Sequence, residues 1–137
     1  MHAQQILSTH PHVRGTTNES LIECIERCYD CAQACTACAD ACLDEEAVKE
    51  LTQCIRLNLD CADVCTAAGA MASRRTGSNT TVLASVLEIC EGACRACGEE
   101  CERHAERHEH CRICAEACNA CADACAVAVK SVRSTSH

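Results

Sequence analysis

The stretch that decides the fold is "CIERCYDCAQACTACADAC", residues 24–42, in which six cysteines follow one another at spacings of four, three, four, three and four residues. Because an α-helix repeats every 3.6 residues, this alternation places all six thiols along one stripe of one helix. Such a stripe is the face that a helix in a bundle turns toward its partners. The stretch therefore predicts a helix whose buried face consists of cysteine.

The same spacing recurs in three further segments and accounts for all 18 cysteines. An internal repeat supports the pattern, since residues 28–42 and 111–125 match at every position except four. The candidate site cysteines are Cys24, Cys28, Cys31, Cys35, Cys38, Cys42, Cys54, Cys61, Cys65, Cys90, Cys94, Cys97, Cys101, Cys111, Cys114, Cys118, Cys121 and Cys125. The sequence therefore predicts several helices that all face one shared, cysteine-lined interior.

Signals for helix ends divide the chain into three parts. Residues 1–17 form a leader with a short helix expected over "AQQIL", residues 18–133 form the bundle, and residues 134–137 form a tail. The first three expected bundle helices span about 18–43, 44–73 and 80–107, with Asn18 and Asp44 as the N-caps of the first two. A tight turn near 108–109 leads into the fourth helix, which is expected to end around 132. The predicted fold is all-α, an antiparallel up-and-down four-helix bundle with cysteines lining the core.

This topology decides which residues meet at each end of the bundle. The two short connections, after Cys42 and before Cys111, lie at one end. The loop "RRTGSNT", residues 74–80, lies at the other end together with Cys24 and Cys125.

Composition excludes several classes of protein. The chain has 137 residues, which suits one domain, but it has no Phe or Trp and one Tyr, so sulfur and Ala must fill much of its core. The formal charge of -8 argues against a nucleic-acid partner. The opening residues lack the features of an export leader and no run is apolar enough to span a bilayer, so we expect a cytoplasmic protein with reduced thiols and no membrane partner.

Metal binding explains the thiol stripe better than packing or disulfides. A core of cysteine alone would be loosely filled, and thiols at helical spacing offer too many equivalent disulfide partners. Eight CxxxC pairs each place two sulfurs on one helix face. Zinc takes about four thiolates and would leave surplus buried charge, whereas one Cu(I) per thiolate leaves the core neutral, so multiple Cu(I) ions are the expected cargo.

The CxxxC pairs on four helices, the near absence of aromatic residues and the missing export leader make the chain resemble the cytosolic branch of the bacterial copper storage proteins over about residues 18–132. The resemblance implies a bundle whose lumen fills with many Cu(I) ions bound mainly by CxxxC thiolates. It also implies a homotetramer. The function expected is high-capacity Cu(I) storage, for copper supply, detoxification or both, with copper chaperones or copper-requiring enzymes as exchange partners.

Histidines gather at the end of the bundle that carries the short connections. In "CERHAERHEHC" the seam spacing continues from Cys101 to His104 and His108, with His110 just beyond. Because imidazole also binds copper, we expect this end to be the mouth where Cu(I) enters. On the second helix Asn58 occupies a seam position, either as an oxygen ligand or hydrogen-bond donor to a thiolate, or as a satisfied polar residue of the core.

Two other functions compete with copper storage. An iron–sulfur electron-transfer protein would also use cysteines, but its ligands usually lie on looped backbone rather than on regular helix. A zinc-buffering thiolate protein would bind about one metal per four cysteines. The sequence has no catalytic triad and no phosphate-binding glycine loop, so we do not expect an enzyme.

Overall fold

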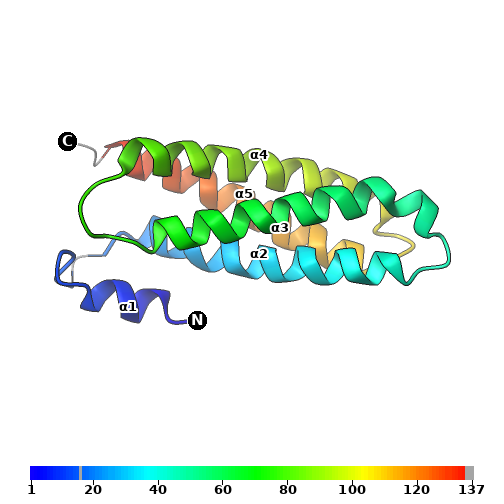
Figure 1. The fold of residues 1–137 in the computed structure, drawn as a ribbon, viewed down its shortest axis with the longest axis horizontal. Helices are drawn as coiled ribbons and strands as arrows, with labels where there is room; N and C mark the ends of the chain where they lie inside the picture. The colour runs from blue at the N-terminus through cyan, green and yellow to red at the C-terminus, as the bar shows by residue number, and fades with distance from the viewer. Residues whose placement is uncertain (16, 135–137) are drawn as a thin grey trace.

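The structure is a computed structural model that describes residues 1–15 and 17–134 (Figure 1). Four long helices run alternately up and down, which confirms the predicted all-α bundle (Figure 1). They are α2 (Glu19–Leu43), α3 (Thr52–Ala72), α4 (Thr80–His104) and α5 (Glu109–Ser134). A short helix α1 (Ala3–Thr9) precedes them, and a 3-10 turn η1 (Val48–Leu51) precedes α3.

The four long helices are arranged as a square around a common axis. Helix α2 packs against α3 and α5, and α4 packs against the same two helices. Within the described residues the diagonal pairs, α2 with α4 and α3 with α5, do not come within 8 Å of each other between Cα atoms. The inward faces of all four helices therefore share one central lumen.

Asn18 begins the bundle as the sequence predicted. Its side-chain oxygen accepts the backbone N–H of Leu21 at 3.1 Å, which satisfies one of the free donors at the start of α2. Its amide nitrogen donates to the Ser131 hydroxyl at 2.7 Å. Asn18 thus caps α2 and also ties this helix to α5.

The predicted start of the second helix at Asp44 is wrong. Asp44 instead caps the end of α2, where its backbone N–H donates to the carbonyl of Ala41 at 3.1 Å. The chain then turns, forms η1 and enters α3 only at Thr52. Leu51 explains the difference, because this side chain is 1% exposed and its burial fixes the 3-10 turn against the end of the bundle.

The predicted continuation of the third helix to residue 107 is also wrong, because α4 ends at His104 and residues 105–107 form a turn. His108 therefore does not continue the helical seam. Its carbonyl accepts the N–H of Cys111 at 3.0 Å, so it stands just before the first turn of α5. Glu109, expected in the turn, is the first residue of that helix.

The leader and the long loop meet at the opposite end. In α1 the side chains of Ala3 and Leu7 are buried, and the imidazole of His10 hydrogen-bonds the Thr76 hydroxyl at 3.1 Å. Inside this end the layer beyond the last cysteines is apolar; it consists of Leu21, Ala68, Ala72, Leu83, Leu87 and Val132, all buried. The expected tail began at Ser134, which is still part of α5, and residues 135–137 lie outside the described residues.

Candidate metal centre

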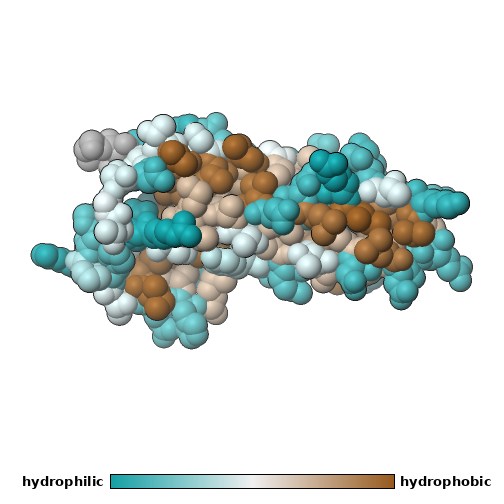
Figure 2. All heavy atoms as spheres, in the orientation of Figure 1, coloured by the Kyte–Doolittle hydropathy of each residue, from teal (hydrophilic) through white to brown (hydrophobic). Residues whose placement is uncertain are grey.

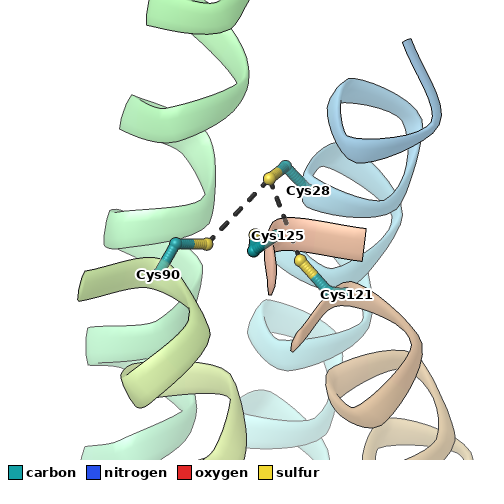
Figure 3. A group of neighbouring side chains, drawn as sticks. All are labelled: Cys28, Cys90, Cys121 and Cys125. Carbon is teal, nitrogen blue, oxygen red and sulfur yellow. Dashed lines mark hydrogen bonds between the residues drawn. The ribbon is translucent and has the colours of Figure 1, made fainter. Parts of the chain in front are cut away.

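All 18 cysteines are free thiols, and none is more than 2% exposed. Each of the four long helices turns its seam toward the lumen, so the sulfurs form one column along the axis of the bundle. Figure 3 shows the group near the long-loop end, with Cys28 from α2, Cys90 from α4, and Cys121 and Cys125 from α5. The structure thus places every predicted cysteine in one shared interior.

The sulfurs contact one another between neighbouring helices and across the diagonals. Between neighbouring helices, Cys24 and Cys125 lie 3.6 Å apart, and so do Cys65 and Cys90. Across the α2–α4 diagonal, Cys28 Sγ lies 3.9 Å from Cys90 Sγ (Figure 3). The sulfur atoms therefore fill the space between diagonally opposite helices, whose backbones do not touch.

Several sets of four cysteines bring their sulfurs within 4.8 Å of one another. These sets are Cys28/Cys90/Cys121/Cys125, Cys31/Cys65/Cys94/Cys121, Cys31/Cys35/Cys61/Cys118, Cys35/Cys97/Cys114/Cys118 and Cys38/Cys42/Cys54/Cys111. The first four sets share members, since Cys121, Cys31, Cys35 and Cys118 each belong to two of them. The fifth set shares none with these four but is joined to them through Cys101, whose sulfur lies 3.8 Å from that of Cys54 and 4.0 Å from that of Cys97. The column is therefore a connected series of sites and not a row of separate ones.

The CxxxC pairs keep the geometry that helix periodicity predicts. Their sulfurs are 3.9 Å apart in Cys24/Cys28, 3.7 Å in Cys31/Cys35, 3.8 Å in Cys61/Cys65 and 4.0 Å in Cys97/Cys101. At metal–sulfur bonds of about 2.3 Å, two thiolates on one metal lie about 3.8 Å apart. Each of these pairs can therefore hold one ion with little movement of the helix.

The packed thiols change one another's acidity. Hydrogen bonds from Cys125 and Cys28 lower the pKa of Cys24 to about 5 against the opposing effect of burial. Hydrogen bonds from Cys101 and Cys111 likewise lower the pKa of Cys54 to about 7. The pKa of Cys28 is raised, first through its contact with Cys121. When one thiol ionises, the neighbouring thiols keep their protons. A thiophilic cation that binds along the column must therefore displace the protons of these remaining thiols.

Asn58 lies in the lumen on α3 and is 0% exposed. Its oxygen accepts hydrogen bonds from the thiols of Cys97 and Cys114, both at 3.0 Å, and from Cys101 at 3.6 Å. Its amide nitrogen donates to Cys54 Sγ at 3.5 Å. In this structure Asn58 is thus a satisfied polar residue of the core, placed among thiols at a position where the seam lacks a cysteine.

The three predicted histidines lie together at the short-connection end and are partly exposed. His104, at the end of α4, hydrogen-bonds Glu100 at 2.9 Å between Nε2 and Oε2. Glu100 is one helical turn earlier, is only 9% exposed at its side chain, and also pairs with Arg103. The ring of His104 is thus held in place by a nearly buried carboxylate.

His108 and His110 are both held by Glu45, a residue of the turn after α2. Glu45 Oε2 lies 2.8 Å from His108 Nδ1 and 2.9 Å from His110 Nε2. The other nitrogen of His110, Nδ1, lies 3.3 Å from Cys38 Sγ. Burial lowers the pKa of His110, but hydrogen bonds to Cys38 and Glu45 raise it further, while the His110 contact lowers the pKa of Glu45. His110 therefore connects the turn at the surface with the first thiols of the column.

Sequence reasoning found the histidines but missed the two glutamates that orient them. Glu100 had a signal, because a glutamate four residues before a histidine lies on the same helix face. Glu45 had none, since it belongs to another connection, 63 and 65 residues away from the two histidines that it contacts.

A four-helix bundle with an unbroken interior column of reduced thiols is a thiolate metal-binding protein. The chain belongs to the copper storage protein family, which its residues 17–130 match.

Solved structures of that family are similar to this chain over most of its length. A copper storage protein from Streptomyces lividans, Ccsp, loaded with 10 copper equivalents, is 53% identical with a TM-score of 0.89, over 93% of this chain and 98% of that one. The Cu(I)-bound copper storage protein BsCsp3 is 40% identical with a TM-score of 0.66, over 76% of this chain and 92% of that one. A curated relative, the uncharacterized cysteine-rich protein YhjQ of Bacillus subtilis, is 40% identical over 92 residues, which are 67% of this chain and 80% of the relative.

Proposed function

We propose that this protein stores Cu(I) ions as cargo, bound by the 18 thiols of its lumen. The observation that carries the proposal is the continuous column of sulfurs, formed by four overlapping groups of four cysteines and by the contacts of Cys101 that join the group at the mouth to them. Membership of the copper storage family supports it, as do relatives described as loaded with copper or Cu(I)-bound. Copper is the cargo here, so we assign the protein no catalytic reaction.

Charge favours Cu(I) over zinc, whereas the sulfur spacing and the overlap of the groups suit both metals. A tetrahedral zinc site takes four thiolates, and two zinc ions can share a thiolate, as Cys121, Cys31 and Cys35 would be shared between groups. A zinc site with four unshared thiolates buries two uncompensated negative charges, and sharing removes only part of this charge, which is costly in a dry lumen. Cu(I) accepts two or three bridging thiolates and replaces one proton with one positive charge, so a filled column stays neutral.

Copper enters, in this proposal, at the end that carries His104, His108 and His110. These side chains are 18%, 14% and 27% exposed, and His110 already contacts Cys38 of the column. At the opposite end the buried side chains described above are apolar and offer copper no ligand. One variant of the Streptomyces lividans relative with two histidines changed to alanine has been solved, and it is 55% identical to this chain.

The experiment that tests this function compares total capacity with the rate of loading. Reduced protein is mixed anaerobically with a Cu(I) chelate, and the chelate signal is followed for the wild type, for the triple variant His104→Ala/His108→Ala/His110→Ala, and for His12→Ala as a control from the leader. We expect slower loading of the triple variant alone, by about 10-fold or more. Equal loading rates for all three proteins would contradict entry at the histidine end. Saturation of the wild-type protein at a few copper ions would contradict the storage function.

Localisation and assembly are parts of the same proposal. No helix of the described chain is long and apolar enough to cross a membrane, and one relative with 57% identity is described as a cytosolic copper storage protein, so we place this protein in the cytoplasm.

We further propose a homotetramer. Apolar side chains gather over α4 and α3 on the face seen in Figure 2, and Leu59, Val82 and Ile89 are 46%, 51% and 60% exposed. We also propose that the protein receives copper from donor chaperones and passes it to copper-requiring enzymes.

A further inference from the structure

Glu45 lies at the mouth of the column and contacts two of the histidines that the sequence placed there, His108 and His110. One oxygen, Oε2, contacts both rings, at 2.8 Å from His108 Nδ1 and 2.9 Å from His110 Nε2. The side chain is 33% exposed and comes from the turn after α2, while both histidines precede or open α5. Glu45 therefore links two connections of the bundle across the mouth.

The chemistry of a carboxylate fixes which ring nitrogens carry hydrogen. An ionised carboxylate only accepts hydrogen bonds, so each nitrogen that touches Glu45 must be the N–H of its ring. His108 then carries its hydrogen on Nδ1 and keeps the lone pair on Nε2. His110 carries its hydrogen on Nε2 and keeps the lone pair on Nδ1. The two neutral imidazoles are thus opposite tautomers.

The assigned lone pair of His110 faces the cysteine column. Its Nδ1 lies 3.3 Å from Cys38 Sγ and 3.7 Å from Cys111 Sγ. In the apo protein this nitrogen can accept a thiol hydrogen, and during loading it can bind a metal ion. The ring of His108 stacks on that of His110, with centroids 5.5 Å apart and planes at 30°. One carboxylate therefore orients both rings, one with its free nitrogen toward the thiols.

We propose that Glu45 is a positioning residue for copper loading, because it holds His108 and His110 as opposite tautomers and so directs His110 Nδ1 toward Cys38 and Cys111. The role resembles that of carboxylates that orient metal-binding histidines in other proteins, where removal of the carboxylate commonly costs 10-fold to 100-fold in affinity or activity. The inference rests on the proposed function, because it requires that copper enters at this end.

The first test is a comparison of loading rates. Glu45→Ala removes the shared acceptor, and Glu46→Ala removes an exposed carboxylate from the same turn as a matched control. Each reduced protein is mixed anaerobically with a Cu(I) chelate. We expect about 10-fold slower loading for Glu45→Ala and the wild-type rate for Glu46→Ala. Equal rates for the two variants would overturn the role of Glu45.

The second test reads the tautomers directly, which a general structural role of Glu45 would not change. Nitrogen NMR of the reduced apo protein is recorded at increasing pH until the imidazole signals stop changing, so that both rings are neutral although the pKa of His110 is raised. We expect hydrogen on Nδ1 of His108 and on Nε2 of His110 in the wild type and in Glu46→Ala, and a mixture of tautomers at both rings in Glu45→Ala. The same tautomer at both rings of the wild-type protein would contradict the assignment.

A double variant separates failure of this inference from failure of the proposed function. If His110→Ala slows loading and Glu45→Ala adds nothing to it, the carboxylate acts through that histidine. If His110→Ala slows loading but Glu45→Ala alone does not, only the role of Glu45 is lost. If neither histidine variant, His108→Ala or His110→Ala, slows loading, the mouth itself is misplaced and the proposed function must be revised.

Discussion

Removal of the Asn58 side chain should destabilise the reduced apo protein. In Asn58→Ala the thiols of Cys97 and Cys114 lose an acceptor at 3.0 Å each, while the weaker contacts of Cys101 and Cys54 are lost as well. A hydrogen bond contributes about 0.5–1.5 kcal/mol net, and the freed thiols can turn to neighbouring sulfurs, so we expect the free energy of unfolding to fall by about 2 kcal/mol. For a chain of this size that corresponds to roughly 6 °C in Tm.

The assay is urea unfolding of the reduced apo protein under anaerobic conditions, followed by circular dichroism. Gln53→Ala on the exposed face of the same helix is the matched control, and it should change stability by less than about 0.5 kcal/mol. Equal stability of the two variants would refute the view that Asn58 supports the thiol network.

The same pair of variants distinguishes the two interpretations of Asn58. Bound Cu(I) replaces the thiol hydrogens, so the hydrogen bonds that Asn58 accepts disappear when the column is filled. If Asn58 is a polar residue of the core, the difference in Tm between Asn58→Ala and wild type should shrink in the copper-loaded protein. A larger difference after loading would show that the Asn58 oxygen binds copper.

Other predictions concern packing and thiol access. Gly92→Ala should raise Tm, because an added Cβ meets nothing within 4 Å and alanine is the better helix former by about 1 kcal/mol. Gly69→Ala should give a lower Tm than Gly92→Ala, because its Cβ would lie 3.0 Å from the ring of Tyr29; equal melting curves would contradict this close approach. A thiol reagent should modify the 18 buried cysteines of the apo protein far more slowly than those of the urea-unfolded chain, with Cys38 and Cys42 at the mouth first by mass spectrometry. Modification beginning at Cys24 or Cys125 would indicate that the other end opens.

The bundle and its thiol column follow from sequence because helix periodicity alone determines both. Spacings of three and four residues place Cys24 to Cys42 on one face whatever the surrounding structure, and burial of that face requires partner helices. The same logic failed at the connections. It extended α4 to about residue 107 and began α3 at Asp44, because local patterns say little about the short segments that must join antiparallel helix ends.

The arrangement of the mouth depends on contacts between connections that are far apart in sequence. Glu45 reaches His108 and His110 only because the turn after α2 and the turn before α5 meet at one end of the bundle. The topology predicted that meeting, but not which side chains would touch. The roles of these residues in copper loading remain the predictions stated above.

The most direct test of the central claim is an anaerobic titration of the reduced protein with Cu(I) against a competing chromogenic chelator. Bound copper, remaining free thiol and released protons are measured together. If the lumen is a storage column, the protein should outcompete the chelator for Cu(I) until about one ion is bound per cysteine, with free thiol falling and protons released in parallel. Saturation at about one ion per four cysteines would contradict the account and favour separate sites of four thiolates each.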